Sequence, residues 1–280
     1  MATRQRVATA AQRVAAVAAV TAAMSAYVRA QWQEYQSLRA DEAECSELLT
    51  TAEAMNTRVV RIPALLSDAE ISSIEELHED LSGQLGTAGR TAGNQAAAYR
   101  QGKWETAYLS TDGLFARHRP ALRSKLLAAV MEVDRSEGWG LLDRVKPERL
   151  APRCVELHSV QPGGSLPYPH HYDAGSLITI DVMLSDRADF EGGDLRTLES
   201  SGEMLTHAPF ERGDALVFVS HKPHCVDAVA RGLRRVLVME CWEGEERECA
   251  HRCERHFGPC THTVRDSFFR RALSDLASDL

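Results

Sequence analysis

The chain has 280 residues, enough for one domain of ordinary size with additional elements. Hydrophobic residues make up 44% and charged residues 26%, as in ordinary globular proteins. A net charge of −8 gives no basic field, so a nucleic-acid partner is not indicated. No apolar run approaches the roughly 18–20 residues that a membrane-spanning helix needs, so no firm membrane span is predicted.

Residues 1–56 are predicted to be an N-terminal helical targeting segment and a connector. The first 33 residues contain four arginines and no acidic residue, and alanine is abundant. This composition is typical of a transit peptide for a mitochondrion or plastid. The apolar run Val14–Val28 also resembles a signal-peptide core or anchor for entry into the endoplasmic reticulum, and an ordinary alanine-rich helix or tail would look similar.

A compact domain is predicted from residue 57 to residue 245. A short strand is expected over Arg58–Pro63. Ser67 and Glu70 then form a capping-box pattern, which satisfies free N–H groups at the start of a helix. That helix should end near Leu81, because glycines follow at positions 83 and 86. The loop 87–101 fits either a binding lid or a loose insertion.

The rest of this domain is predicted to be dominated by strands. A strand over Trp104–Leu109 and an amphipathic helix over Phe115–Val133 come first, followed by a strand over Arg153–Gln161. Short apolar segments such as Leu177–Leu184 and Ala215–Val219 then alternate with turns rich in Gly, Pro and Asp. We therefore expect a mainly β fold with flanking helices (α+β): a double-stranded β-helix, or jelly roll, supported by N-terminal helices.

Three side chains in the strand-rich half have the composition of an iron site. His171 and Asp173 are two residues apart, so on an extended strand they would point to the same side, and His170 to the other. A distal histidine lies downstream, where His224 competes with His221. Two imidazoles and one carboxylate on one face of Fe(II) leave the remaining positions open for a co-substrate and dioxygen.

The order of motifs around these residues resembles a known enzyme family. PHHYDAGSLITI followed by DFEGG is similar to the lysyl hydroxylase catalytic domain, and HCVDAV-x-x-G-x-R is similar to the end of the prolyl hydroxylase core. Residues 57–245 thus resemble the prolyl 4-hydroxylase and lysyl hydroxylase branch of the 2-oxoglutarate/Fe(II) dioxygenases. In that family a His-x-Asp pair and a distal His bind iron. The spacing to the Gly-Leu-Arg sequence that ends in Arg234 favours His224 over His221.

The resemblance implies further site residues and cofactors. Arg234 stands where the family binds the far carboxylate of 2-oxoglutarate, and Arg235 would face the opposite side of the strand. Tyr168 matches a position near the co-substrate, although a packing role is equally consistent with the sequence. No catalytic residue beyond the metal centre is expected. The implied cofactors are Fe(II), 2-oxoglutarate and O2, with ascorbate as a reductant.

The implied activity is hydroxylation of a C–H bond, on a prolyl or lysyl side chain of a protein or peptide, with release of succinate and CO2. Asp173 favours hydroxylation, because related halogenases lack this carboxylate. Two alternatives are a catalytically idle jelly-roll binding module and a cupin-like metalloenzyme that does not use 2-oxoglutarate. The sequence does not indicate the oligomeric state.

The tail, residues 246–280, is rich in cysteine and histidine. Three cysteines (Cys249, Cys253, Cys260) alternate with three histidines (His251, His256, His262). A structural zinc site of the Cys₃His type, a disulfide and ordinary free thiols on a helix all fit this composition. A closing amphipathic helix is expected over residues 263–280.

Overall fold

The computed structural model describes residues 50–85, 103–145, 149–207, 210–258 and 260, with isolated positions between 20 and 29. The chain divides into two units, Met1–Ala43 and Glu44–Leu280, and the second contains the sheets. The predicted loop 87–101 and closing helix lie outside the described residues, as does most of the predicted targeting segment. Within the described part of the chain, no helix combines the length and apolar character of a membrane span.

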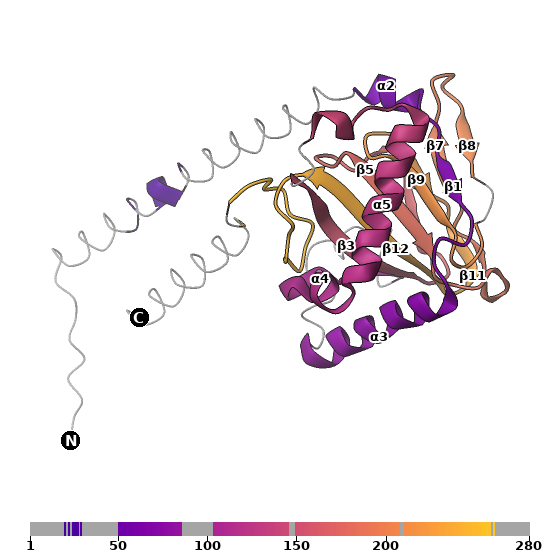
Figure 1. Cartoon of the computed structure of the whole chain (residues 1–280), viewed down its shortest axis with the longest axis horizontal. Coiled ribbons are helices and arrows are strands. Elements are labelled where there is room, and N and C mark those ends of the chain that lie inside the picture. The colour runs from indigo at the N-terminus through magenta and orange to yellow at the C-terminus, as the bar shows by residue number, and fades with distance from the viewer. Residues whose placement is uncertain are drawn as a thin grey trace, which may run out of the picture. The chain divides into compact units, whose positions relative to one another are not determined.

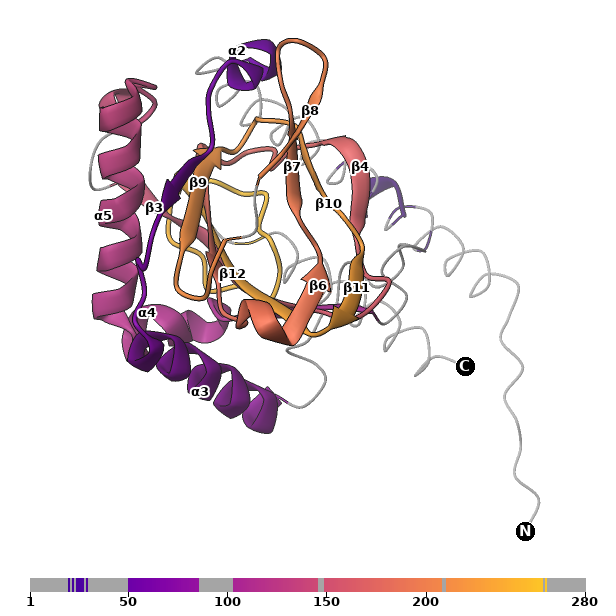
Figure 2. The ribbon, with the colours of Figure 1, turned by 90° about the vertical axis from the view of Figure 1, so that its right-hand side faces the viewer.

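Two antiparallel sheets form the body of the second unit (Figures 1 and 2). The larger has the order β1-β9-β5-β12-β3-β2, and the smaller has the order β4-β10-β7-β8. The bounds in the larger sheet are Val60–Ile62 (β1), Ala215–Val219 (β9), Ile178–Met183 (β5), Arg234–Glu243 (β12), Leu150–Val160 (β3) and Trp104–Tyr108 (β2). Those in the smaller sheet are Leu166–His171 (β4), His224–Val226 (β10), Leu195–Leu198 (β7) and Met204–Thr206 (β8). A further pair joins β6 (Phe190–Gly192) to β11 (Val229–Gly232).

Helices cover one face of the larger sheet, as Figure 2 shows. They are α3 (Asp68–Leu85), α4 (Leu114–His118) and α5 (Pro120–Glu137); the short α2 (Thr51–Met55) precedes β1, and 3-10 turns lie at Thr111–Gly113, Leu142–Arg144 and Arg187–Asp189. Apolar residues of these helices and of this face of the sheet form the main core: Ile71, Ile74, Leu126, Val130, Ile180, Val217 and Leu237, among others. The predicted mainly β fold with flanking helices is confirmed.

The opposite face of the larger sheet looks toward the smaller sheet. Side chains alternate along β5, so Ile178, Ile180 and Val182 pack under the helices, while Met183 belongs to a second core. This second core draws on both sheets: Phe218, Val236 and Val238 from the larger, Leu166, Leu195 and Val226 from the smaller. The helix-facing side of β5 is thus apolar, whereas its other side also carries the polar Thr179 and Asp181, which line the space between the sheets.

Two helix boundaries differ from those predicted. The capping box is present, with Ser67 N donating to Glu70 Oε2 at 2.8 Å, but the helix continues past Gly83 to Leu85. A glycine inside a helix costs about 1 kcal/mol relative to alanine, which weakens a helix without ending it. The single helix predicted over Phe115–Val133 is two helices, because Pro120 begins α5 and its ring cannot donate a backbone hydrogen bond to α4.

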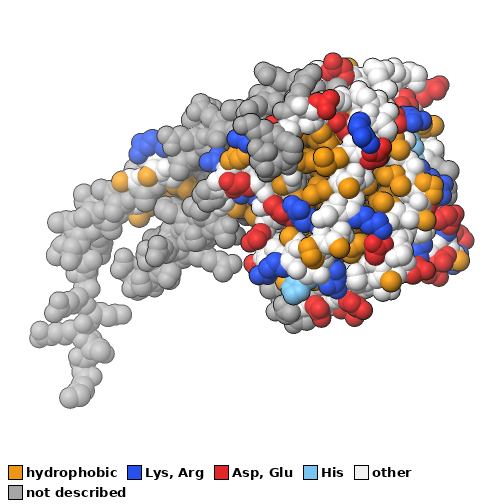
Figure 3. Space-filling view, viewed as in Figure 1, with side chains coloured by type: hydrophobic (Ala, Val, Ile, Leu, Met, Phe, Trp, Pro, Cys, Tyr) orange, Lys and Arg blue, Asp and Glu red, His pale blue; other side chains and the backbone are white. Residues whose placement is uncertain are grey.

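The surface shows no large field of one charge on the face seen in Figure 3. Acidic and basic side chains are interspersed there among apolar ones over the coloured part of the chain. On this face there is accordingly no basic field of the kind that the sequence composition also fails to indicate.

Candidate metal centre

The two histidines of the predicted triad meet through strand pairing. His171 ends β4 and His224 begins β10, and the antiparallel ladder pairs these two residues directly. Their ring centroids lie 5.0 Å apart. Strand pairing in the smaller sheet therefore brings together two residues that are more than fifty positions apart in the sequence.

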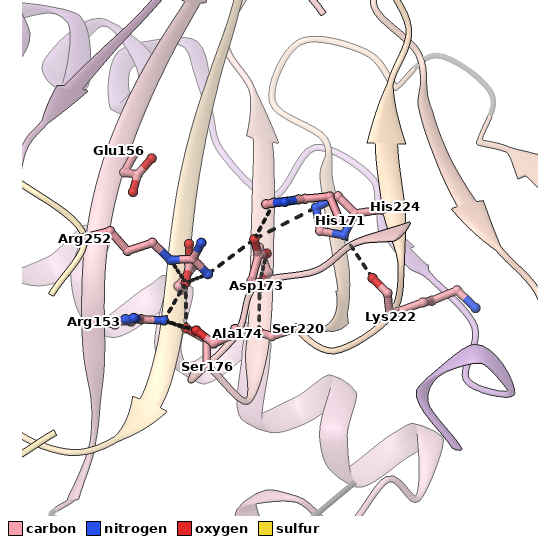
Figure 4. Close-up of polar contacts among 12 residues, drawn as sticks. Arg153, Glu156, His171, Asp173, Ala174, Ser176, Ser220, Lys222, His224 and Arg252 are labelled. Carbon is pink, nitrogen blue, oxygen red and sulfur yellow. Dashed lines mark hydrogen bonds and ion pairs between the residues drawn. The ribbon is translucent and has the colours of Figure 1, made fainter. Parts of the chain in front are cut away.

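Asp173 reaches the same point from a loop rather than from a strand (Figure 4). Its Oδ1 lies 3.4 Å from His171 Nε2 and 3.9 Å from His224 Nε2. Alternation along one strand was the predicted reason for this proximity, and that reason is wrong, because β4 ends at His171. The Asp173 backbone N–H instead donates to the Ser220 carbonyl at 2.8 Å, which fastens the loop beside the turn that precedes β10.

Hydrogen bonds orient two of the three ligands, Asp173 and His224, toward the shared point. Thr179 Oγ1 donates to Asp173 Oδ2 at 2.8 Å, so Oδ1 is the oxygen that faces the histidines. His224 Nδ1 lies 2.9 Å from the Lys222 carbonyl, which can only accept, so the lone pair of this ring is on Nε2. Such outer contacts fix the tautomer and orientation of metal ligands.

The charges of the three side chains suit a divalent metal. Burial lowers the pKa of His224, which keeps its imidazole neutral. Burial also raises the pKa of Asp173, but His224, His171 and Arg252 together outweigh burial and hold it below its usual range. Two imidazoles and a carboxylate are the donor set that non-haem Fe(II) takes in oxygenases. The three ligand atoms lie within 4.8 Å of one another.

A buried lysine holds the turn that supplies His224. Lys222 is fully buried, and its Nζ donates to the carbonyls of Met55 (3.1 Å) and Thr57 (2.7 Å). It also forms an ion pair with Glu199 at 2.9 Å. These contacts tie the turn to the segment after α2, so Lys222 is a structural support for the ligand next to it.

A cavity of about 720 Å³, including solvent at its mouth, extends from the triad between the two sheets. Arg234 lines this cavity and is only 1% exposed. Its Nε has no hydrogen-bond partner, and no carboxylate among the described residues forms an ion pair with it. Gly193 allows the arginine to pack there, since a Cβ at Gly193 would lie 2.6 Å from Arg234 Cδ.

This arrangement fits a dicarboxylate co-substrate. Burial lowers the pKa of Arg234, but a guanidinium stays charged in proteins, so the cavity contains a fixed cation with which no carboxylate of the described residues forms a direct ion pair. Apolar side chains line the walls: Leu195, Phe218, Val226, Val236 and Val238. The far carboxylate of 2-oxoglutarate would complete the hydrogen bonding of Arg234.

The competing residues lie elsewhere, as predicted. Arg235 faces the helices and forms an ion pair with Glu75 of α3 at 3.3 Å. His170 is exposed. His221 packs against the ring of Tyr172, with 5.4 Å between centroids, and is not one of the clustered ligands.

Tyr168 does not line the cavity, and its side chain is 58% exposed. The structure therefore does not support the predicted contact with the co-substrate. The pairing shifts between His224–His171 and Val226–Leu166, and this irregularity reverses the side-chain alternation of β4. Trp104 of β2 and His158 of β3 line the cavity instead.

An ionic cluster that the sequence did not predict lies beside the triad. Arg252 Nη2 lies 2.8 Å from Glu240 Oε2 and 3.5 Å from Asp173 Oδ1 (Figure 4). Glu240 could have been found, because it lies six residues after Arg234 on one strand and therefore faces the same side. Arg252 gave no such signal, since it comes from the tail.

The tail itself is not the helix that one prediction placed there. Residues 244–258 contain bends and irregular segments, with neither helix nor strand. Cys249, His251, Cys253 and Cys260 converge, with their four ligand atoms within 4.8 Å of one another. His256 is separate and stacks on Trp242, and His262 lies outside the described residues.

Comparison with known proteins gives structural neighbours only. No protein-family model and no curated sequence matches the chain. A prolyl hydroxylase from Trichoplax adhaerens, solved with a hypoxia inducible factor peptide fragment, has 16% identity and a TM-score of 0.49, over 76% of this chain and 93% of that one. A 2OG-Fe(II) oxygenase family protein from Burkholderia pseudomallei has 13% identity and a TM-score of 0.48, over 75% and 92%. The epimerase SnoN from nogalamycin biosynthesis has 15% identity and a TM-score of 0.48, over 72% and 84%. The assignment of the site rests on the side chains described above.

Proposed function

We propose that the chain is an Fe(II)- and 2-oxoglutarate-dependent dioxygenase that hydroxylates an unactivated C–H bond. One observation carries the proposal: a triad of His171, Asp173 and His224 shares a cavity with Arg234, a buried guanidinium with which no carboxylate of the described residues forms a direct ion pair. A metal site alone would fit many proteins. The added cation fits a co-substrate with a second carboxylate.

Each residue has a distinct task in this reaction. His171, Asp173 and His224 would hold iron on one face, and Arg234 would orient 2-oxoglutarate. Bound iron supplies the activation of O2: one oxygen atom enters the C–H bond, and the other enters the succinate formed as 2-oxoglutarate loses CO2. Phe218 and Val236 would supply apolar surface beside the reacting centre.

The proposed substrate is a prolyl or lysyl side chain of a protein or peptide, and ascorbate is the proposed reductant. Both rest on the sequence resemblance of residues 57–245. The arginine-rich, acid-poor N-terminus supports targeting to an organelle or entry into the endoplasmic reticulum.

The test is an anaerobic titration of Fe(II)-loaded protein with 2-oxoglutarate, followed by the visible charge-transfer band of the chelate. We expect a saturable band in the natural chain. In Arg234→Ala the apparent Kd should rise at least tenfold, because the far carboxylate loses its cation. Arg235→Ala is the matched control: it removes a neighbouring arginine that faces the helices and should leave the titration unchanged.

Absence of the band in protein with verified iron content would overturn the proposal. A cupin-like metalloenzyme that needs no keto acid would give that result, with iron bound. A binding module without catalysis would fail to bind iron. An unchanged titration in Arg234→Ala would reject the role of this arginine while leaving the metal site in place.

A further inference from the structure

The tail contains a second cluster of metal-ligating side chains. The ligand atoms of Cys249, His251, Cys253 and Cys260 lie within 4.8 Å of one another, and Cys260 Sγ is 3.3 Å from His251 Nε2. In a tetrahedral zinc site the sulfurs are about 3.8 Å apart, because Zn–S bonds are about 2.3 Å long. The distances between these ligand atoms therefore need to shorten by about 1 Å at most to match a zinc site.

The surrounding backbone is shaped around this cluster without regular structure. Arg247, which is mostly buried, donates to the carbonyls of Arg255 and Gly258 and so closes a loop of the tail. Cys253 is only 1% exposed and packs with Ala151 and Trp242, where Cys249 and Cys260 also pack. A short segment that lacks helix and strand needs cross-links to hold one conformation, and a structural zinc ion supplies such links.

Arg252 lies between two of the four clustered ligands in the sequence. His251 and Cys253 flank Arg252, so two ligands of one site would fix the backbone on both sides of this arginine. Figure 4 shows the Arg252 side chain extending toward Asp173. Its Nη2 lies 2.8 Å from Glu240 Oε2 and 3.5 Å from Asp173 Oδ1.

The buried guanidinium of Arg153 also connects the cysteine cluster to the loop that follows Asp173. Arg153 Nε donates to the Cys253 carbonyl at 2.5 Å. Its Nη1 donates to the Ala174 carbonyl and to Ser176 Oγ, in the loop that follows Asp173. The cysteine cluster and the loop that presents Asp173 are thus held by the same side chain.

From these contacts we infer that Cys249, His251, Cys253 and Cys260 bind one structural Zn²⁺ ion, which holds Arg252 and the loop of Asp173 in place. Zinc binding is independent of the proposed oxygenase activity. The effect on the iron site rests on that proposal. Arg252 is a positioning residue, since it contacts a metal ligand and not the substrate.

The first experiment measures metal in the full-length chain. After purification with zinc present, we expect about one Zn²⁺ per chain, and Co²⁺ in its place should give the intense visible spectrum of tetrahedral thiolate coordination. Cys249→Ser and Cys260→Ser should retain less than a tenth of the zinc. Cys225→Ser is the matched control, because this buried thiol lies in β10 outside the cluster and its loss should leave zinc content unchanged.

His171→Ala separates the two sites, since it removes a ligand of the triad only. Zinc content should stay at one per chain in this variant. Loss of zinc in His171→Ala but not in the cysteine variants would overturn the inference. So would a Co²⁺ spectrum without thiolate ligation in the unmodified chain, or a disulfide between two of these cysteines found by mass spectrometry of unreduced protein.

The second experiment tests the link to the triad with Mn²⁺, which favours carboxylate and imidazole over thiolate. Followed by electron paramagnetic resonance, Mn²⁺ affinity should fall about tenfold in Cys260→Ser and in Arg252→Gln, as for the loss of other outer contacts of metal ligands. Arg252→Gln should keep its zinc. Arg231→Gln, which removes an exposed arginine paired with Glu191, is the control of equal charge change.

Mn²⁺ affinity within twofold of the natural chain in both variants would overturn the link and leave the zinc site standing. If no Mn²⁺ binds to the unmodified chain while zinc is present, the proposed oxygenase function fails and the zinc site again stands. The two claims therefore fail separately.

Discussion

At the scale of single residues, one hydroxyl decides which oxygen of Asp173 faces the metal. Thr179 Oγ1 donates to Oδ2 at 2.8 Å and also lies 2.8 Å from Ser220 Oγ, in the turn that receives the Asp173 N–H. The threonine thus aligns both the carboxylate and the loop that carries it. A side chain of the same shape without the hydroxyl would leave the carboxylate free to rotate.

We expect Thr179→Val to weaken Fe(II) binding about tenfold, the usual scale for an outer hydrogen bond to a metal ligand. Metal titration under anaerobic conditions measures the effect. Thr106→Val is the control, because Thr106 Oγ1 is buried without a hydrogen-bond partner among the described residues, so its loss should not affect the metal and should not lower stability. Equal effects in the two variants would show that packing, and not the hydrogen bond, supports Asp173.

Asp181 gives the cavity a pH dependence. This carboxyl lines the cavity near Arg234, and burial raises its pKa to about 7, although Arg234 opposes the shift. Below that pH the carboxyl is mostly neutral, and the charge of Arg234 is available to 2-oxoglutarate. Above it, the ionised carboxylate competes for the arginine and repels the anionic co-substrate.

The Kd of 2-oxoglutarate for iron-loaded protein should therefore rise between pH 6 and pH 8, by about tenfold if the carboxylate shifts the binding by one pKa unit. Asp181→Asn should bind at the low-pH affinity throughout. Anaerobic titrations at the two pH values measure this difference. A parallel rise in Asp181→Asn would assign the pH dependence to another group.

At the scale of elements, the corner between β11 and β12 places Arg234. Gly232 ends β11 with φ at +79°, and a Cβ there would lie 1.8 Å from the Asp189 carbonyl oxygen. The glycine is thus required twice, by its positive φ and by the close backbone of the turn before β6. Arg234 follows two residues later, so any shift of this corner moves the co-substrate anchor.

We expect Gly232→Ala to lower the free energy of unfolding by about 3 kcal/mol or more, the sum of backbone strain and a clash with rigid backbone. It should also weaken 2-oxoglutarate binding. Gly202→Ala is a close match in φ, at +83°, with no atom within 4 Å of the added Cβ, so it should cost only about 1 kcal/mol of strain. Urea unfolding compares the two, and similar losses would reject the role of the close contact.

The strands also show which structural features can be predicted from the sequence alone. Apolar patterning predicts β9 with its observed bounds, the family resemblance predicts Arg234 in the site, and alternation then predicts Arg235 on the opposite side of the strand. The strand bounds and the facing of neighbouring residues depend on local periodicity, which can be read directly from the sequence. The irregular pairing of β4 depends on a distant strand, so no local sequence pattern predicts it.

The same distinction applies to the site. His171 was a candidate from its spacing to Asp173, His224 was favoured over His221 by the family resemblance, and Glu240 was predictable from its even separation from Arg234. Arg252 was not, because its place beside Asp173 depends on the path of an irregular tail. Nor did the spacing of Cys249, His251, Cys253 and Cys260 decide among zinc, a disulfide and free thiols: convergence of ligands requires a folded backbone.

At the scale of the whole molecule, the proposed ligands would connect the two sheets. His171 and His224 belong to the smaller sheet, whereas Arg234 belongs to the larger. A co-substrate chelated at the triad and held by Arg234 would therefore bridge the cavity from one sheet to the other. Metal alone would strengthen only the smaller sheet and the loop of Asp173.

This geometry predicts an effect on stability that depends on both ligands. In Mn²⁺-loaded protein, 2-oxoglutarate at about 100 times its Kd should add about 2.7 kcal/mol to the free energy of unfolding, and hydrogen exchange should slow in β4 and β10 as well as in β12. Without metal, the same concentration should add little. Arg234→Ala should lose the increment and keep the stabilisation by metal, while Arg235→Ala keeps both. An increment that survives in Arg234→Ala would mean that the co-substrate binds at the metal without reaching the larger sheet.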